Sequence, residues 1–340
     1  MARPLRATES VSAEISRNLA LELVRVTEAG ALASARWMGR GDKNSADGAA
    51  VEAMRLSLGK IEMDGVVVIG EGEKDEAPML YIGERIGSGV PPQVDIAVDP
   101  VEGTTLLSKG LPNAISVIAM AGGRGSLYDA KHVAYMHKLA TGADAAGSFN
   151  IEDPIGVNLQ RIARAKRMRV SALSVVILDR PRHEGLIKEI REAGARIKLI
   201  SDGDVAGALM TAIEGTGLDV LAGIGGATEA VLSACALKSL GGEIQCKLYA
   251  RNPEEKAAAE AAGADFGEVL GIDDLVRSDD VFFAATGVTE GEVLKGVGYH
   301  MNWAETESLV TRSRSGTVRR IHARHHWGYK SREWLGQPEG

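Results

Sequence analysis

Aromatic residues and cysteines are both scarce in this chain of 340 residues. Aromatic side chains make up 4% of the sequence, and its two cysteines are Cys235 and Cys246. Two cysteines are too few for a disulfide framework, and these two lack the CxxC spacing or paired histidines that would indicate zinc. We therefore interpret both as buried packing residues.

Long hydrophobic runs are also missing. Apolar stretches such as Val66–Ile69 are far shorter than the roughly 20 residues of a membrane span. The start, MARPLRATES, has no apolar stretch like that of a secretory signal. The sequence thus predicts a cytoplasmic protein with no membrane partner.

Positive charge is not concentrated on this chain. The formal net charge is −7, which argues against a nucleic-acid partner. The tail, Arg319–Arg332, is basic and contains His322, His325 and His326, and we interpret it as a solvated terminal segment because it has no carboxylate or cysteine at a useful spacing for metal. A small anionic substrate would need local positive charge from a few arginines or lysines, or from bound cations.

The order of apolar patterns predicts a mixed α/β protein. From residue 173 onward, strand and helix patterns alternate, which indicates a largely parallel α/β lobe. Earlier in the chain, apolar periodicity predicts helices, and β-branched runs predict buried strands. The main expected elements outside the alternating lobe are helices at 13–38 and 47–61 and strands at 66–69, 94–98, 115–120, 281–285 and 309–321.

The length exceeds a usual domain of roughly 100–150 residues, so we expect more than one unit. We predict a metal-binding α+β domain over residues 1–160 and a parallel α/β substrate domain over 161–280. C-terminal strands and the tail, over 281–340, are expected to pack on the core.

Acidic residues recur where the strands predicted at 66–69 and 94–98 end. Hard cations such as Mg²⁺ and Mn²⁺ prefer oxygen ligands, and carboxylates at strand exits are held rigidly enough to place two cations near each other. In Val94–Thr105, proline fixes one φ and glycine permits a tight turn between acids and hydroxyl residues, a combination that a surface loop seldom needs. The candidate ligands are Asp47, Glu71, Glu73, Asp99, Glu102 and Glu229.

Candidate anion-binding residues follow a later strand. Arg180 and Arg182 flank Pro181 after a buried strand, at the carboxyl end where α/β folds place ligands. Asp202 and Asp204 suit either a helix cap or sugar hydroxyls. The cluster Gly223–Gly226 lacks the GxGxxG register of dinucleotide sites and favours a backbone cradle for substrate.

The segment Asp99-Pro100-Val101-Glu102-Gly103-Thr104 resembles the metal-binding signature of the lithium-sensitive, Mg²⁺-dependent sugar and inositol phosphatases. Five further segments resemble, in order, the motifs of class II fructose-1,6-bisphosphatase, and the resemblance covers roughly Asn18 to Ile321. These segments are Gly41–Gly48, Ile69–Pro78, Arg180–His183, Asp202–Asp204 and Gly223–Gly226.

The resemblance implies a layered α/β/α/β/α fold and hydrolysis of the C1 phosphate of fructose-1,6-bisphosphate by a metal-activated water, in gluconeogenesis or Calvin-type metabolism. It also implies two or more Mg²⁺ or Mn²⁺ ions and a homo-oligomer, a dimer or a tetramer. Asp47 and Glu71 would bind one metal, and Asp99, Glu102 and Glu229 another. Thr104 and Asp47 would be catalytic. The implied substrate contacts are Glu102, Gly103, Thr104, Tyr135, Arg180, Pro181, Arg182, Asp202, Gly203, Asp204 and Gly226, with Lys43 as a further source of positive charge.

Two departures from the family pattern preserve the charges. The sequence around the last acid is Ala227-Thr228-Glu229-Ala230, where relatives often have proline and glycine, and Glu102 stands where many have aspartate. Tyr135, judged without the resemblance, is a half-buried strand aromatic. The alternatives that stay open are a dual fructose-1,6-/sedoheptulose-1,7-bisphosphatase, an inositol monophosphatase, and a non-catalytic metal- or nucleotide-binding regulator.

Overall fold

A computed structural model describes residues 15–71, 80–130 and 132–327. Over these residues the strands form two sheets. The first sheet contains β1 (Asp64–Ile69), β2 (Arg85–Ile86), β3 (Gln93–Glu102), β4 (Ile115–Gly122), β10 (Val281–Gly287), β11 (Gly298–Tyr299), β12 (Trp303–Arg312) and β13 (Thr317–His326). Its order is β11-β12-β10-β4-β3-β1-β2, with β13 paired to β12.

The second sheet has the order β7-β6-β8-β5-β9. Its strands are β5 (Tyr135–Thr141), β6 (Ser174–Leu178), β7 (Arg196–Ile200), β8 (Val220–Gly226) and β9 (Glu243–Tyr249). The strand β6 pairs in parallel with β7 and β8, as expected for the alternating lobe. Only β5 runs against its neighbours, since it is antiparallel to both β8 and β9.

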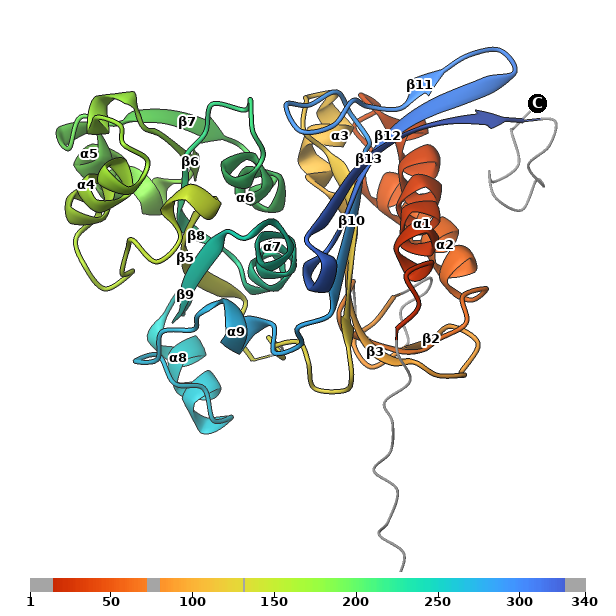
Figure 1. Cartoon of the computed structure of the whole chain (residues 1–340), viewed down its shortest axis with the longest axis horizontal. Helices are drawn as coiled ribbons and strands as arrows, with labels where there is room; N and C mark the ends of the chain where they lie inside the picture. Colours follow the sequence, from red (N-terminus) through yellow and green to blue (C-terminus); the bar gives the residue numbers. More distant parts are fainter. Residues whose placement is uncertain (1–14, 72–79, 131, 328–340) are drawn as a thin grey trace, which may run out of the picture.

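Helices separate and flank the two sheets (Figure 1). Helices α4 and α5 cover the outer face of the second sheet, α6 and α7 lie between the sheets, and α1 and α2 cover the far face of the first. This is the five-layered α/β/α/β/α arrangement that the family resemblance implied. The helices are α1 (Leu19–Ser34), α2 (Lys43–Leu58), α3 (Thr104–Lys109), α4 (Ile155–Ala165), α5 (Glu184–Glu192), α6 (Asp204–Ala212), α7 (Ala227–Leu240), α8 (Pro253–Ala261) and α9 (Ile272–Leu275).

The central helices explain why the two sheets stay together. Helices α6 and α7 are apolar around most of their circumference, with small residues that allow close packing. Their buried side chains form one continuous core with the inner faces of both sheets, including Val117 of β4, Ala285 of β10 and Leu221 of β8. Burial of apolar surface on both sides of this layer is the main force that joins the sheets.

The hairpin of β12 and β13 corrects two expectations. A single strand at 309–321 was predicted, but the chain turns at Ser313–Ser315 and returns as β13. The basic tail is therefore not a solvated segment as far as His326. His325 is 4% exposed, and its Nε2 lies 2.8 Å from Thr306 Oγ1. Period-2 alternation, obscured by the many charged side chains, places this histidine on the face of the sheet that α1 covers, where its Nε2 lies 3.9 Å from Glu28 Oε1.

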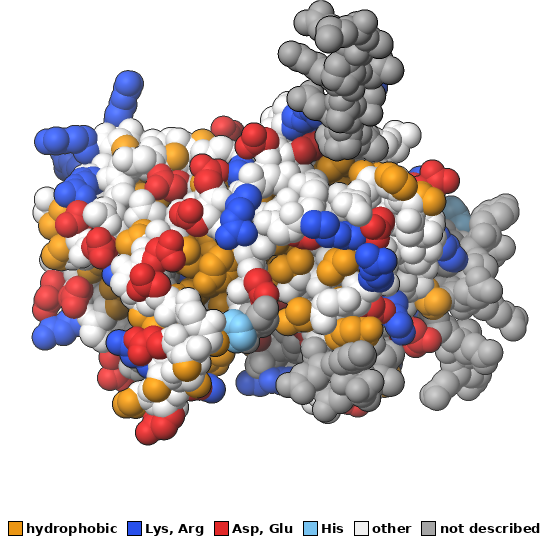
Figure 2. Space-filling model, turned by 90° about the horizontal axis from the view of Figure 1, so that it is seen from below, with side chains coloured by type: hydrophobic (Ala, Val, Ile, Leu, Met, Phe, Trp, Pro, Cys, Tyr) orange, Lys and Arg blue, Asp and Glu red, His pale blue; other side chains and the backbone are white. Residues whose placement is uncertain are grey.

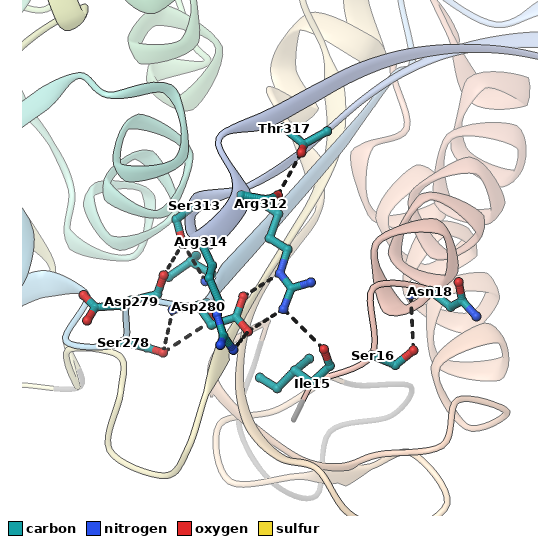
Figure 3. Close-up of polar contacts among 12 residues, drawn as sticks. Ile15, Ser16, Asn18, Ser278, Asp279, Asp280, Arg312, Ser313, Arg314 and Thr317 are labelled. Carbon is teal, nitrogen blue, oxygen red and sulfur yellow. Dashed lines mark hydrogen bonds and ion pairs between the residues drawn. The ribbon is translucent and has the colours of Figure 1, made fainter. Parts of the chain in front are cut away.

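An ion pair anchors the turn of this hairpin to the rest of the first sheet (Figure 3). Arg312 Nε and Nη2 each donate to the Asp280 carboxylate at 2.7 Å, and Nη2 also donates to the carbonyl of Ile15 at 3.3 Å. Both ionic side chains are largely buried. The two-pronged geometry joins the segment before α1, the start of β10 and the end of β12.

A third correction concerns α2, which was expected to start at residue 47. It starts at Lys43 because Asp42 serves as its N-cap and accepts the Ser45 N–H at 3.0 Å. Asp47 thus lies within the second turn of the helix and not at its end. The predicted domain limits at residues 160 and 280 stay a prediction, while β5 joins the second sheet and the strands after residue 280 join the first.

The surface seen from below carries charges of both signs. Figure 2 shows acidic, basic and hydrophobic side chains interspersed over this face. Among the described residues, no helix combines the length and the apolar character that crossing a membrane requires.

Candidate active site

Most of the predicted acids and both predicted arginines line one cavity of about 300 Å³ between the two sheets. The strand β3 and the segment that follows β1 contribute from the first sheet, and β5, β6 and β8 contribute from the second. The cavity is lined by Glu71, Asp99, Val101, Glu102, Gly103, Thr104, Tyr135, Leu178, Arg180, Arg182, Asp202, Gly203, Asp204, Gly225, Gly226 and Glu229.

The turn at the end of β3 presents most of the acidic wall. Asp99 Oδ1 accepts the backbone N–H of Val101 at 3.1 Å, which folds the chain over the carboxylate. Gly103 has φ 85°, a left-handed conformation that favours glycine, and it allows α3 to start at once with Thr104. The Thr104 hydroxyl donates to the Val101 carbonyl at 3.1 Å. Local sequence therefore fixes the position of this turn.

Glu102 joins the acidic wall to the second sheet's helices. Its Oε1 accepts the backbone N–H of Val205 at 2.8 Å, at the amino end of α6. Its Oε2 is buried and has no hydrogen-bond partner. The residue is 2% exposed, so burial, followed by the charge of Asp204, raises its pKa well above the usual value.

Asp47 and Glu71 form the other part of the acidic cluster. Their carboxyl groups share a hydrogen bond, and Asp47 Oδ1 is buried with no partner. Burial and then the Asp47 charge raise the pKa of Glu71 to about 8. Burial also raises the pKa of Asp99, with Glu71 and Glu102 as the next causes. Several carboxyl groups thus lie close enough to oppose one another's ionisation.

Glu229 enters from the first turn of α7, directly after β8. Its Oε2 accepts the hydroxyl of Thr228 at 2.6 Å. A Cβ on Gly226 would lie 1.8 Å from the same oxygen, so the absence of a side chain there leaves room for the carboxylate. In the same way, a Cβ on Gly225 would lie 1.9 Å from Asp204 Oδ2. The glycines at the end of β8 are needed because acidic side chains pack against the backbone.

The donor set fits a hard divalent cation. Two buried carboxylate oxygens lack partners, and the neighbouring acids have raised pKa values, so a bound cation would compensate charge that the protein itself leaves unpaired. Within residues 15–71, 80–130 and 132–327, however, no three His, Cys, Asp or Glu side chains are already arranged as the ligands of one ion.

Two arginines and Tyr135 line the side of the cavity nearer the second sheet. Arg180 Nη2 donates to the carbonyl of Ser201 at 2.7 Å. Arg182 Nε and Nη2 donate to the carbonyl of Ile224 at 3.2 and 2.8 Å, and its guanidinium carbon lies 5.3 Å from the centre of the Tyr135 ring. Backbone carbonyls therefore hold both cations in place.

The remaining predicted residues lie at the edges of the site. Asp202 Oδ2 accepts the backbone N–H of Thr105 at 3.3 Å, and Lys43 Nζ donates to the hydroxyl of Thr105 at 2.8 Å. Pro181 opens the turn that carries Arg182. Glu73 lies outside the described residues. The individual roles of all these residues stay predictions.

Sequence reasoning missed two buried residues behind the cavity. Lys138 of β5 is 2% exposed, and its Nζ donates to Asp204 Oδ2 at 2.6 Å. His183 is 1% exposed and bonds two backbone groups. No local signal identifies Lys138, because its partner is 66 residues away. His183 stands beside Arg182 in a segment that the sequence analysis singled out, but its partners are not visible in the sequence.

Comparison with known proteins shows the family of this chain. The family model for bacterial fructose-1,6-bisphosphatase, glpX-encoded, matches residues 17–325. The fructose-1,6-bisphosphatase 1 class 2 of Escherichia coli strain K12 is 45% identical over 330 residues, which cover 93% of this chain and 98% of that protein. The class 2 enzyme of Shigella flexneri matches with the same identity and coverage.

The fold, the acidic cavity and these matches define a phosphoric monoester hydrolase. Within that class, the chain belongs to the bacterial class 2 fructose-1,6-bisphosphatase family.

Proposed function

We propose that this protein hydrolyses the C1 phosphate of fructose-1,6-bisphosphate and releases fructose-6-phosphate and inorganic phosphate. The observation that carries the proposal is the cavity of about 300 Å³, in which an acidic wall and a pair of arginines face one space. A sugar with a phosphate at each end suits this division, because one phosphate can react while the other is held. The near-full-length similarity to class 2 enzymes supports the same substrate.

The family depends on divalent metal ions. We assign two or more Mg²⁺ or Mn²⁺ ions to this chain, held by Asp47, Glu71, Asp99, Glu102 and Glu229. When bound, such ions polarise a phosphoryl oxygen and lower the pKa of a bound water. The unpartnered oxygens of Asp47 and Glu102 support the assignment.

Thr104 and Asp47 are the proposed catalytic residues. The Thr104 hydroxyl already donates its proton to the Val101 carbonyl, so its free lone pairs face outward as acceptors. It would accept a hydrogen bond from the attacking water and orient that water toward phosphorus. Asp47, with one oxygen free of partners, would take the proton that the water releases.

The distal phosphate and the sugar would contact the second sheet's side of the cavity. Arg180 and Arg182 would pair with the phosphate, with Lys43 as a further cation. Tyr135, Gly226 and the segment Asp202–Asp204 would contact the sugar. Asp204 is held by Lys138, so its carboxylate has a fixed orientation toward the substrate.

The two arginines favour a bisphosphate over an inositol monophosphate, since a single phosphate at the acidic wall would leave both arginines without a phosphate partner. Sedoheptulose-1,7-bisphosphate has the same two ends and is the second candidate substrate. A non-catalytic regulator would bind these ligands without releasing phosphate. We further propose a homo-oligomer, a dimer or a tetramer, that works in the cytoplasm in gluconeogenesis or Calvin-type sugar phosphate metabolism.

The test is phosphate release from a panel of sugar bisphosphates and monophosphates with added Mg²⁺ or Mn²⁺. Fructose-1,6-bisphosphate is expected to react, and EDTA is expected to stop the reaction. Asp99→Asn is expected to abolish turnover while circular dichroism stays unchanged, because the side chain lines the cavity and bonds only its own turn. Activity that survives EDTA would contradict the metal assignment, and the absence of phosphate release would favour the regulator.

A further inference from the structure

We propose that His183 is a positioning residue that sets the Arg182 guanidinium for the distal phosphate. The inference rests on the proposed function, which assigns that phosphate to Arg182. His183 ends the turn Pro181–His183 and is 1% exposed. It does not line the acidic cavity but a neighbouring one of about 320 Å³, to which Arg182 also contributes. Any effect of His183 on the substrate must therefore pass through another group.

The two hydrogen bonds of the imidazole determine its tautomer. Its Nε2 lies 2.7 Å from the backbone nitrogen of Ile224, which can only donate. The Nε2 atom must then be an unprotonated acceptor. Its Nδ1 lies 2.7 Å from the carbonyl oxygen of Leu178, which can only accept, so Nδ1 carries the proton. The ring is neutral and joins the end of β6 to the end of β8.

Ile224 transmits the position of His183 to Arg182. Its N–H group is bound by His183, and its carbonyl accepts both the Nε and the Nη2 of Arg182. The guanidinium is exposed, and no carboxylate of the described residues pairs with it, so this carbonyl is its main anchor. Its direction thus depends on how firmly the Ile224 peptide is held.

The backbone beside the ring is shaped for this contact. A Cβ on Gly223 would lie 3.1 Å from His183 Nε2, and Gly223 has φ 130°, which favours glycine. The strand therefore approaches the imidazole closely at the residue before Ile224. A histidine that only filled space would not need both ring nitrogens bonded to the ends of two different strands.

Two conservative variants separate the two bonds. In His183→Gln, the side-chain oxygen can replace Nε2 and accept the Ile224 N–H. In His183→Asn, the shorter amide can replace Nδ1 and donate to the Leu178 carbonyl, but it cannot reach Ile224. We expect His183→Asn and His183→Ala to raise KM for fructose-1,6-bisphosphate by about 5- to 50-fold with kcat nearly unchanged, and His183→Gln to recover most of the loss.

Binding of fructose-6-phosphate, measured by calorimetry in EDTA, gives a readout that does not depend on turnover. This molecule carries only the distal phosphate, so its Kd is expected to follow the same order as KM. His322→Gln is the matched control, because that side chain is 67% exposed on β13. Thermal melts of each variant show whether it is folded.

Equal losses in His183→Gln and His183→Asn would overturn the positioning role, as would a fall in kcat at unchanged KM. Failure of the positioning role can be told apart from failure of the proposed function by the behaviour of the wild type. A wild-type protein that binds fructose-6-phosphate without hydrolysing the bisphosphate would contradict that function, while the Kd order would still decide the role of His183. A wild type that does neither would overturn both.

Discussion

The hydroxyl of Thr104 offers the sharpest test at the scale of one residue. It lies next to the acids on the β3 turn and donates to the Val101 carbonyl. If its lone pairs orient the attacking water, Thr104→Ala should lower kcat by about 10²- to 10⁴-fold and leave metal affinity nearly unchanged. Thr104→Ser should recover part of the activity. Steady-state kinetics and metal titrations make the comparison.

The opposite result for Thr104 is equally specific. If the hydroxyl only closes the turn, its loss should lower the melting temperature and the metal affinity together. An alanine variant with near-normal kcat at saturating metal would leave the water to the metals and Asp47.

The pH dependence of stability should reveal the titration of the His183 imidazole. Burial lowers the pKa of its imidazole below 6.5, and Arg182, Arg180 and the neighbouring His137 also disfavour the charged form. A depressed pKa means that the unfolded chain takes up the proton first as pH falls. The contribution of His183 is therefore complete above pH 6.5 and is lost as pH falls through the folded-state pKa.

Glutamine keeps the Ile224 bond at every pH. The melting temperature of the wild type should thus fall relative to that of His183→Gln between pH 7.5 and pH 5. Parallel curves for the two proteins would show that His183 does not titrate in this window.

At the scale of elements, we expect a side chain added at the end of β8 to disturb the site while leaving the fold stable. The three atoms nearest to a Cβ on Gly226, at 1.8 to 2.6 Å, all belong to the Glu229 carboxylate, the flexible end of a side chain. We expect Gly226→Ala to displace Glu229 and to reduce activity or metal affinity by about 10- to 100-fold, while the melting temperature changes little.

The matched control for Gly226→Ala is Gly156→Ala. A Cβ at Gly156, in α4, would have its nearest neighbour at 3.9 Å, so this variant should keep full activity. If both variants are fully active, Glu229 is not needed where the structure places it. If Gly226→Ala unfolds at a much lower temperature, its effect is on the strand and not on the site.

The elements that the sequence predicted best are those whose consecutive residues form a recognisable apolar pattern. Continuous apolar runs, such as 66–69 in β1, 96–98 in β3 and 175–178 in β6, are buried or half-buried because helices cover both faces of their sheets. The acids of the site follow these runs directly, so the strand ends also located Glu71 and Asp99. The layer order came from the family resemblance, since composition and periodicity only indicate a mixed α/β chain.

The elements that the sequence misplaced depend on contacts between distant segments. The strand β13 carries six arginines and histidines, and only its pairing with β12 identifies it as a strand. The start of α2 depended on a cap, where Asp42 competed with Asp47 for the same role. The local sequence predicts that Lys138 is an exposed strand residue, because its partner Asp204 is distant in the sequence. Pairings of this kind do not follow from local propensity.

At the scale of the whole molecule, the site lies at the junction of the two sheets. Asp47, Glu71, Asp99 and Glu102 come from the first sheet and its covering helix, whereas Glu229 comes from the helix that follows β8. The apolar core of α6 and α7 holds the sheets together against the repulsion of these buried acids. A divalent cation held by acids from both sides would remove that repulsion and should stabilise the entire fold.

Thermal melts in EDTA, Mg²⁺ and Mn²⁺ test this coupling. A ligand at 100 times its Kd stabilises the folded state by about 2.7 kcal/mol, which should raise the Tm of a chain of this size by roughly 4 °C. Glu71→Gln should lose most of that gain, because one proposed ligand is gone. Its Tm in EDTA should not fall, since burial and the Asp47 charge oppose ionisation of Glu71 and raise its pKa to about 8. Glu62→Gln, at an exposed position away from the cavity, should keep the whole gain. Equal Tm values with and without metal in the wild type, or a full gain in Glu71→Gln, would mean that no cation binds these acids across the two sheets.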